Sequence, residues 1–210
     1  MGPRLNVPAL GGSLVRLEPL SVSHAADLAR AAEEDRSAYG FTVVPRAGQV
    51  QEYVAAQLAR DGLTCFAQVQ VRNGAAMGCT AFCDPRAWPG RSDLRAIEVG
   101  WTWLGASAQG TGINAEAKFL LFSYAFETLG VARVDLKTDA RNDRSRRAIG
   151  GLGARFEGVL RCWSPSRAPG EEGMLRDSAM FSVVAAEWPA VKSTLAIRVA
   201  SASTRSRGPA

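Results

Sequence analysis

Histidine is nearly absent from this 210-residue sequence, since His24 is the only one. The four cysteines, Cys65, Cys79, Cys83 and Cys162, form no C-x-x-C pair. Structural zinc sites need clustered cysteine and histidine ligands, so these absences argue against such a site and no metal is expected. Buried free thiols explain the cysteines better than two disulfides do, because nothing else in the sequence indicates secretion.

Long apolar stretches are also missing. No run of about 18 apolar residues exists, so no transmembrane helix is expected. The N-terminal segment contains charges and glycines and lacks the continuous apolar run of a secretory signal. We therefore expect a cytoplasmic protein with no membrane partner.

Lysine is scarce as well, because only Lys118, Lys137 and Lys192 occur among the 25 basic residues. The formal net charge is +5, and the segment 199–210 supplies two of these charges without any acidic residue. We expect 199–210 to be a disordered basic tail and 1–198 to form one domain, because a chain of this length leaves little room for two cores. Without the tail the net charge is 5 − 2 = +3. This mild excess suits an anionic cofactor and gives little support for a nucleic-acid partner.

The spacing of apolar residues predicts a mixed α/β chain. An Asn73-Gly74 pair between two strand-like runs is a strong hairpin signal. Hairpins come first, and one strand–helix–strand unit follows in the middle of the chain. Strands are predicted at 14–18, 65–71, 77–83, 96–104, 131–138, 156–163 and 175–184, a long turn at 84–90, and helices at 21–34, 49–60, 114–129, 142–152 and 187–199.

A glycine loop connects the strand 96–104 to the helix 114–129. Its residues are Gln109, Gly110, Thr111, Gly112, Ile113 and Asn114. The first turn of a helix leaves backbone N–H groups unbonded, the helix dipole adds positive charge there, and glycines let a ligand approach closely. The loop is therefore a candidate phosphate site, with a turn that binds no ligand as the alternative.

Two common phosphate loops do not fit this segment. A Walker A loop requires a Gly-Lys pair, and none follows here. A dinucleotide fingerprint belongs to the first strand–helix turn of a parallel sheet. Predicted hairpin strands precede this loop instead, which argues against that interpretation.

Three further motifs accompany the loop. They are Ile97-Glu98-Val99-Gly100-Trp101-Thr102-Trp103-Leu104, Asn142-Asp143-Arg144-Ser145 and Leu152-Gly153-Ala154-Arg155-Phe156-Glu157-Gly158. In their order and spacing, the sequence from about Leu14 to Leu195 resembles the GNAT acetyltransferase superfamily, and within it the RimJ/RimL-like branch. Asn114 departs from the family loop, which usually has Gly or Ala at that position.

The resemblance implies an α/β fold with a mixed, mostly antiparallel central sheet, splayed central strands at 96–104 and 131–138, and helices on both faces. Acetyl-CoA would lie as co-substrate in the gap between those two strands. The residues implied in its binding are Trp103 and Leu104 along the pantetheine arm, Gln109, Gly110, Thr111, Gly112, Ile113 and Asn114 at the pyrophosphate, Asn142 at a pantetheine amide, and Arg147 at the phosphates.

The implied reaction is direct attack of a primary amine on the thioester in a ternary complex. It needs a base for the ammonium and an acid for the leaving thiolate. Because His24 is interpreted as a solvated surface residue, a carboxylate or a water chain must be the base, and Glu98 is the first candidate. Ser145 is the candidate acid. The alternatives are a structural ion pair for Glu98 and an ordinary first-turn position for Ser145.

The sequence gives the least information about the acceptor of the acetyl group. This acceptor is either a protein N-terminus, as the RimJ/RimL resemblance suggests, or a small-molecule amine, and the acyl group is acetyl or longer. A homodimer is left open. The alternative to an enzyme is a non-catalytic acyl-CoA-binding or regulatory module with the same fold. Such a module would lack acid–base groups in its cleft.

Overall fold

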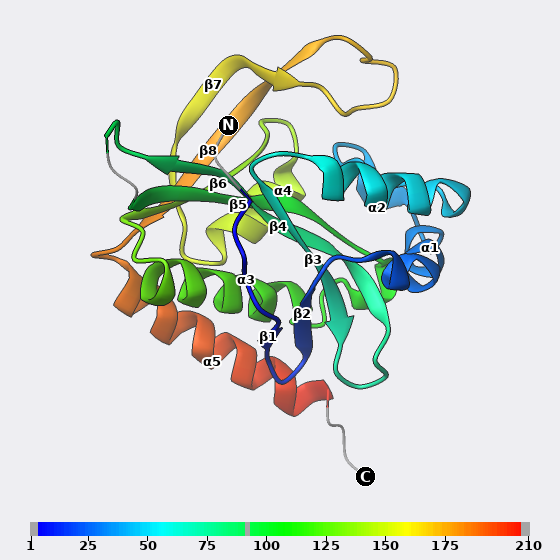
Figure 1. The fold of residues 1–210 in the computed structure, drawn as a ribbon, viewed down its shortest axis with the longest axis horizontal. Coiled ribbons are helices and arrows are strands. Elements are labelled where there is room, and N and C mark those ends of the chain that lie inside the picture. Colours follow the sequence, from blue (N-terminus) through cyan, green and yellow to red (C-terminus); the bar gives the residue numbers. More distant parts are fainter. Residues whose placement is uncertain (1–3, 91–92, 207–210) are drawn as a thin grey trace.

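An eight-stranded sheet runs through the computed structural model, which describes residues 4–90 and 93–206 (Figure 1). The strand order is β1-β2-β3-β4-β5-β6-β8-β7, and every neighbouring pair is antiparallel except the parallel pair β5–β6. The predicted class, a mixed and mostly antiparallel α/β fold, is confirmed. The strands are β1 (Leu10–Gly11), β2 (Val15–Pro19), β3 (Leu63–Gln70), β4 (Ala76–Ala87), β5 (Leu94–Leu104), β6 (Arg133–Asp139), β7 (Arg155–Pro165) and β8 (Leu175–Val184).

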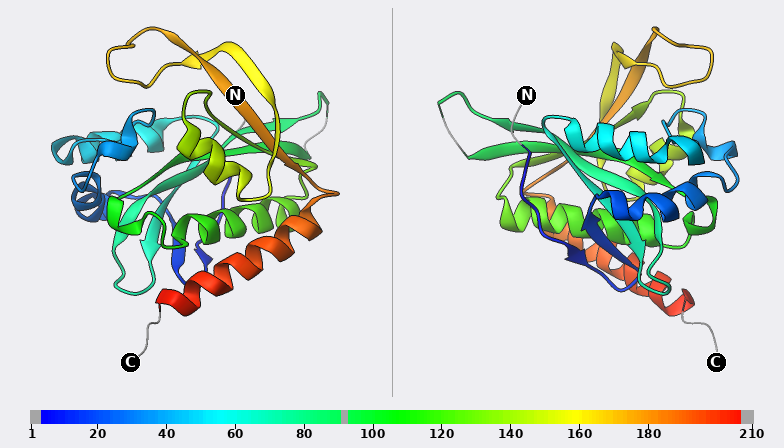
Figure 2. Two further views of the ribbon diagram at one scale, coloured as in Figure 1. Left: turned by 180° about the vertical axis from the view of Figure 1, so that it is seen from behind. Right: turned by 45° about the vertical axis from the view of Figure 1, so that its right-hand side comes forward.

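Helices cover both faces of this sheet (Figure 2). They are α1 (Ala25–Ala32), α2 (Val50–Ala59), α3 (Ile113–Ser123) with a π-helical continuation (Tyr124–Thr128), α4 (Asp143–Gly150) and α5 (Trp188–Ser206), with 3₁₀ turns at Val22–His24, Ser37–Tyr39, Ala47–Gln49 and Ala106–Ala108. α3 and α5 lie side by side on one face, and α1 and α2 lie on the other. Over the described part of the chain, no helix is long and apolar enough to cross a bilayer.

Two clusters of buried side chains fill the space between the helices and the sheet. Ile97, Leu121 and Phe122 are fully buried on the α3 and α5 side. Leu28 and Val54 are fully buried on the α1 and α2 side. Burying one large apolar side chain contributes roughly 1.5–3 kcal/mol, so the two layers together hold the central strands in place.

The direction of the side chains along β5 changes at Trp101. Ile97 and Val99 pack toward α3, whereas Trp101 and Trp103 pack on the α1 and α2 face. Trp101 has φ 52°, and between the pairs Cys79–Trp103 and Ala81–Gly100 the strand β5 has one residue more than β4. This is a β-bulge, which re-aims the side chains that follow it. Simple alternation along the strand therefore does not predict where the two tryptophans lie.

The parallel strands β5 and β6 separate after a short ladder. Their register includes only the three residue pairs from Ala96–Arg133 to Glu98–Asp135. Beyond this point β5 continues to Leu104 next to β4, and β6 continues next to β8. The predicted splay of the central strands is confirmed.

Helix α5 corrects the prediction for the C-terminal tail. Residues 199–206 are helical rather than disordered, because α5 extends to Ser206. Ala202 is buried, and a Cβ placed on Gly112 would lie 2.5 Å from the Ala202 Cβ. Packing against the glycine loop thus orders a segment whose composition suggested disorder. Residues 207–210 lie outside the described residues, and the boundaries of the predicted domain 1–198 stay a prediction.

Strand β4 is longer than its sequence indicates. The long turn predicted at 84–90 is wrong in its first half, since β4 runs to Ala87 and Arg86 pairs with Ala96 of β5. The guanidinium of Arg86 also forms an ion pair with the buried Asp135 of β6. This long-range pairing extends the strand across Asp84-Pro85, which local turn signals alone assign to a loop.

The only histidine is more enclosed than expected. The side chain of His24 is 11% exposed, and its Nε2 lies 3.0 Å from Glu18 Oε2. Its Nδ1 is hydrogen-bonded to the N–H of Ser21, 3.2 Å away, so the ring closes the turn that begins α1. His24 is therefore a partly buried structural residue rather than a solvated one.

The cysteines are all free thiols. Cys65, Cys79 and Cys83 are buried, as predicted, and burial raises the pKa of each thiol. Cys162 is exposed, because it lies on the edge strand β7, so its predicted burial is wrong. Among the described residues, no group of three or more His, Cys, Asp or Glu side chains is arranged to hold a metal ion.

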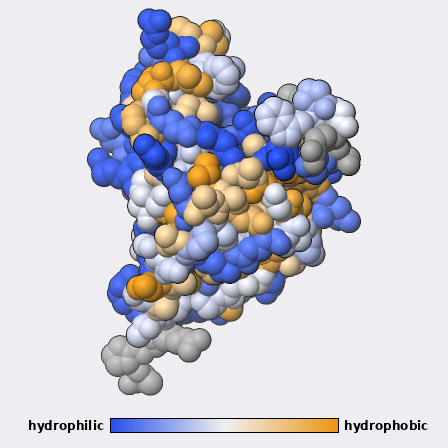
Figure 3. All heavy atoms as spheres, turned by 90° about the vertical axis from the view of Figure 1, so that its left-hand side faces the viewer, coloured by the Kyte–Doolittle hydropathy of each residue, from blue (hydrophilic) through white to orange (hydrophobic). Residues whose placement is uncertain are grey.

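Strand β7 forms one edge of the sheet and exposes several large apolar side chains. In the space-filling view, apolar atoms reach the surface of the lobe that contains the β7–β8 hairpin (Figure 3). Val159, Leu160, Trp163 and Leu175 are all more than a third exposed there. Exposed apolar patches often mark interaction surfaces.

Glu116 fastens the start of α3 to the N-terminal strands. Its buried carboxylate accepts hydrogen bonds from the N–H groups of Ser13 (2.7 Å), Leu14 (2.6 Å) and Val15 (2.8 Å) and from the Ser13 hydroxyl (2.8 Å). A carboxylate in the first turn of a helix is also favoured by the helix dipole. The position of the glycine loop therefore depends on a contact with a segment about a hundred residues away.

Candidate functional site

The candidate site lies where β5 and β6 diverge. The end of β5 leads through the 3₁₀ turn Ala106–Ala108 into the glycine loop and α3, and the end of β6 leads into α4. Two helix N-termini therefore follow the carboxyl ends of the two diverging strands. Such a position presents unbonded backbone N–H groups and the positive ends of two helix dipoles.

The glycine loop has the backbone geometry expected of an anion cradle. Gly110 and Gly112 have φ values of 76° and 95°, and Gly112 is the N-cap of α3. Within residues 4–90 and 93–206, no hydrogen bond engages the N–H groups from Gly110 to Asn114. A Cβ placed on Gly110 would meet no atom within 4 Å, so open space faces these donors.

Of the remaining loop residues, two make contacts within the protein and one has a side-chain oxygen without a hydrogen bond in the described part of the chain. Ile113 is 2% exposed and belongs to the core, and the Thr111 hydroxyl donates to the Ala108 carbonyl at 2.7 Å. The Asn114 Oδ1 atom is buried and has no hydrogen-bond partner among the described residues. A buried acceptor atom without a hydrogen bond lowers the stability of the fold. Asn114 is therefore a candidate contact for a donor group of a ligand.

A hydrogen-bond bridge links the glycine loop to α4 across the gap. The Gln109 side chain donates from Nε2 to the Leu104 carbonyl at 2.7 Å and accepts at Oε1 from Arg144 Nη2 at 2.5 Å. The Tyr39 hydroxyl donates to the same Leu104 carbonyl at 2.8 Å. Leu104, Gln109 and the first turn of α4 are thus brought together as the sequence predicts.

Trp103 does not face this gap. Its carbonyl accepts a hydrogen bond from Gln68 Nε2 at 3.2 Å, and a Cβ on Gly78 of β4 would lie 2.1 Å from the same oxygen. Its indole Nε1 donates to the Tyr53 hydroxyl at 3.2 Å, and the side chain is buried. The β5 bulge turns Trp103 into the core, so of the two predicted pantetheine contacts only Leu104 lies toward the gap.

Asn142 is the N-cap of α4, as predicted. Its Oδ1 accepts from the Ser145 N–H at 3.0 Å, while its amide nitrogen makes no hydrogen bond with another described residue. The Ser145 hydroxyl is half-buried and likewise has no partner in the described part of the chain. Both side chains therefore keep a polar group available at the start of α4.

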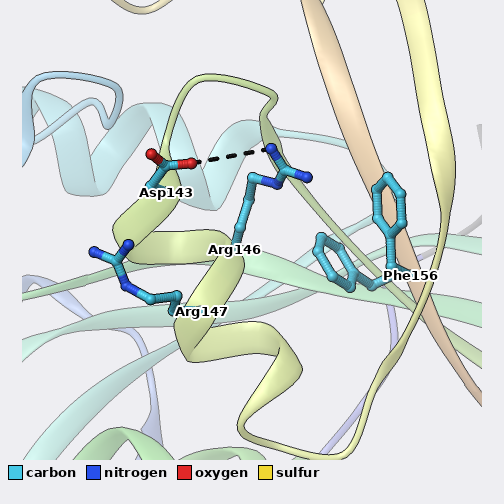
Figure 4. Close-up of a pocket in the computed structure, with 5 residues that line it drawn as sticks. Asp143, Arg146, Arg147 and Phe156 are labelled. Carbon is cyan, nitrogen blue, oxygen red and sulfur yellow. Dashed lines mark ion pairs between the residues drawn. The ribbon is translucent and has the colours of Figure 1, made fainter.

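A shallow pocket of about 420 Å³ lies beside α4. Figure 4 shows Arg146 directed toward Phe156 and Arg147 extending on the other side of the helix. The Arg146 guanidinium lies 5.4 Å from the centre of the Phe156 ring, a cation–π distance. Arg147 is exposed, and among the described residues its guanidinium has no ion-pair partner. Of the two arginines, Arg147 is the one that is free to contact an anion.

Glu98 occupies the last rung of the β5–β6 ladder. Its side chain is 8% exposed and points away from α3, and Oε2 accepts from Lys137 Nζ at 2.5 Å. Oε1 lies beside Gly100, where a Cβ would be 3.1 Å from it and 3.5 Å from the Cys83 Sγ, and the Cys83 thiol interacts with the Glu98 side chain. Lys137 therefore fixes one carboxylate oxygen, and the other lies between Gly100 and the Cys83 thiol. No hydrogen bond between described residues joins Glu98 to Ser145.

A buried lysine that contacts the bulged part of β5 was not predicted from the sequence. Lys118 of α3 is 3% exposed, and its Nζ donates to the hydroxyls of Thr80 (2.8 Å) and Thr102 (2.6 Å). Burial lowers the pKa of Lys118 to about 7. Its sequence signal is a lone lysine on the otherwise apolar, buried face of a helix. Because Thr102 directly follows Trp101, Lys118 fixes the bulged part of β5.

Replacing Lys118 by Met should remove a pH dependence of stability. The unfolded chain keeps this amine protonated to about pH 10, whereas the folded protein releases the proton near the lowered pKa. Between these values the unfolded state binds more protons, so wild-type stability gains about 1.4 kcal/mol per pH unit from this group. The wild-type minus Lys118→Met difference in unfolding free energy, from urea titrations at pH 7, 8 and 9, should therefore rise with pH. A difference that stays flat would contradict a neutral buried lysine.

Comparison with known proteins agrees with this geometry. Residues 15–155 match the family model described as an acetyltransferase (GNAT) domain. A GCN5-related N-acetyltransferase from Brucella melitensis is 28% identical, with a TM-score of 0.81 over 94% of this chain and 87% of that one. A protein assigned as an acetyltransferase in T. thermophilus is 32% identical, with a TM-score of 0.75 over 92% of this chain and 98% of that one.

A more distant structure shares the fold alone. It is RimL, the ribosomal L7/L12 α-N-protein acetyltransferase in complex with coenzyme A, which is 16% identical with a TM-score of 0.65 over 84% of this chain and 97% of that one. A search of the curated proteins finds no match. The similarity of this chain to known proteins is therefore shown by the family model and by solved structures.

Proposed function

The chain belongs to the GNAT acetyltransferase family, and on that premise we propose that this N-acetyltransferase transfers the acetyl group of acetyl-CoA to a primary amine by direct attack in a ternary complex. The observation that carries the proposal is the gap between β5 and β6, with the unbonded N–H groups of the glycine loop at its edge. The protein acts in the cytoplasm on an acceptor that is a small amine or a protein N-terminus.

The residues around the gap fit acetyl-CoA, which the family uses as acyl donor. The N–H groups from Gly110 to Asn114, with open space beside Gly110, suit a pyrophosphate. Arg147 is exposed and unpaired among the described residues, and Asn142 keeps its amide donors free at the start of α4. When bound, acetyl-CoA supplies an electrophilic thioester carbonyl and a thiolate leaving group.

Two side chains of this protein would accept and donate the protons of the reaction. Glu98 takes the proton of the incoming ammonium through a water, using the Oε1 oxygen that Lys137 leaves free. Ser145, whose hydroxyl is unbonded at the start of α4, gives a proton to the departing sulfur. Ion pairing with Lys137 keeps the Glu98 side chain in one orientation, which favours a preorganised base.

The RimJ/RimL-like assignment is part of the proposal. It rests on the motifs at 97–104, 109–114, 142–145 and 152–158, whose order and spacing resemble that branch, because RimL itself shares only the fold. The rival is a non-catalytic acyl-CoA-binding module with the same fold. The presence of Glu98 beside the gap, with one carboxylate oxygen that Lys137 does not hold, favours the enzyme over that module.

A turnover screen tests the proposal as a whole. The purified chain is given acetyl-CoA with peptide N-termini, polyamines, aminoglycosides and amino acids, and free thiol is measured. We expect amine-dependent thiol release for at least one class. Absence of both release and acetyl-CoA binding would overturn the proposed function, whereas binding without release from any amine would favour the non-catalytic module.

Replacing Gly110 by Ala should weaken acetyl-CoA binding while the protein stays folded. The added Cβ meets no protein atom but enters the space in front of the amide donors, and the φ of 76° costs about 1–2 kcal/mol. We expect a dissociation constant at least about tenfold higher by calorimetry. Gly112→Ala is the contrasting variant, because its Cβ would lie 2.5 Å from Ala202 and should mainly lower the melting temperature. Gly48→Ala, at an open position without positive φ, is the control; equal affinity of all variants would rule out the loop as the anion site.

Replacing Glu98 by Gln should slow the acetyl transfer without weakening acetyl-CoA binding. The amide retains the shape and a hydrogen bond but cannot accept the proton, so kcat should fall by about 10²–10⁴-fold. Stopped-flow thiol release measures kcat, and calorimetry measures the dissociation constant. Glu52→Gln, an exposed first-turn residue of α2, is the matched control. Wild-type kcat in Glu98→Gln would leave Glu98 with only a structural role.

A further inference from the structure

Strand β8 presents two polar groups that have no partner within the described part of the protein. The Oγ of Ser178 and the Nε of Arg176 are buried, and neither forms a hydrogen bond with any described residue. Ser178 is 0% exposed, while Arg176 is half-buried. Leaving a buried donor unbonded costs about 1–3 kcal/mol, so a ligand that hydrogen-bonds both groups would remove that cost.

These two groups lie on the same face of the sheet as Glu98. Ala179, Phe181 and Val183 of β8 pack into the α3 and α5 core, so the alternate residues Arg176 and Ser178 face the other way. The ladder pairs Ser178 with Asp139 of β6, two residues beyond Lys137, which holds Glu98. The strand alternation thus places Arg176, Ser178 and the candidate base along one side of the splayed strands.

Of the described cations Lys137, Arg141 and Arg176 on this face, only Arg176 forms no ion pair, although together they balance Glu98, Asp139 and Glu171. Glu98 is paired with Lys137, and Arg141 is shared by Asp139 (2.9 Å) and Glu171 (2.7 Å). Among the described residues, no carboxylate forms an ion pair with Arg176. Burial lowers its pKa, the charges of Asp139 and Glu98 oppose this change, and Arg167 and Arg141 add to it.

Two segments border this region. β7 covers one side, where Ser164 pairs with Arg176. On another side, the Phe41 ring lies 5.2 Å from the Arg141 guanidinium, which brings the connection between α1 and α2 close to Asp139 and β8. An acceptor between these segments would meet Glu98 at one end and Arg176 at the other.

We propose that the acceptor is a small amine that carries one carboxylate, which Arg176 binds through its guanidinium and Ser178 through its hydroxyl. This inference rests on the proposed function and specifies its acceptor. A planar guanidinium matches a carboxylate with two parallel hydrogen bonds. Because the charged groups on this face already sum to zero, a ligand with a single negative charge is favoured over a phosphate dianion.

The amino group of such a molecule would then be directed toward Glu98. In the transfer step its nitrogen forms the bond to the acetyl carbon as the C–S bond breaks. Before this attack the ammonium gives one proton to Glu98 through water. The thiolate takes its proton from Ser145, which in turn takes up the second proton that the nitrogen loses, so the products are the amide and the free thiol. The carboxylate held by Arg176 is unchanged in the reaction.

The test compares matched pairs of acceptors with the full chain and acetyl-CoA. The acids are glycine, β-alanine, 4-aminobutyrate and 6-aminohexanoate, and each is compared with its own carboxamide by kcat/KM for thiol release. For the best chain length we expect the acid to exceed its amide by about 10- to 100-fold. Arg176→Gln should bring that ratio close to one, Arg176→Lys should retain part of it, and Ser178→Ala should lower it less.

Arg72→Gln provides the matched control, because Arg72 is exposed in the turn between β3 and β4 and should leave the ratio unchanged. The acid-to-amide ratio separates recognition from folding, since a merely unstable variant loses both activities together. Equal kcat/KM for acids and amides in the wild type, an unchanged ratio in Arg176→Gln, or acetylation of peptide N-termini but of none of these acids would overturn the inference and leave acetyl transfer intact. Failure of acetyl-CoA binding together with no thiol release from any amine would instead overturn the proposed function, and this inference with it.

Discussion

The short parallel ladder between β5 and β6 is the constraint on which the site depends. Because the two strands pair over only three residues and then separate, each must find other partners for its remaining length. β5 finds them in β4 and β6 in β8, which leaves a gap bounded by the ends of both strands. Glu98 sits at the last rung, and the glycine loop and α4 begin beyond it, so donor binding and proton transfer are organised around one point of divergence.

Several contacts from distant parts of the chain hold the edges of this gap. Glu116 ties the start of α3 to the N-terminal strands, and Lys118 fixes the bulge of β5 from beneath. Ala202 of α5 packs on Gly112, so the C-terminal helix supports the loop that presents the amide donors. The site thus consists of unbonded backbone groups held in place by bonded side chains around them. This arrangement is suited to anion binding, because the donors need no rearrangement when a ligand arrives.

Local signals in the sequence predict much of this structure. The Asn73-Gly74 hairpin, the glycine loop and the Asn142 cap depend on neighbouring residues, and each occurs where expected. Features that depend on tertiary pairing were not predicted: the bulge that turns Trp103 into the core, and the extension of α5 through Ala202. The absence of an ion pair at Arg176 among the described residues belongs to the same group, because only the fold shows which carboxylates contact other cations.

The central claim is that the free amides of the glycine loop bind the pyrophosphate of acetyl-CoA. Hydrogen–deuterium exchange of the full chain, with and without coenzyme A, measures those amides directly. We predict slower exchange at residues 110–114 when coenzyme A is present, because each donor gains a hydrogen bond. Unchanged exchange at 110–114, with protection confined to the pocket beside α4 and β7, would contradict the account.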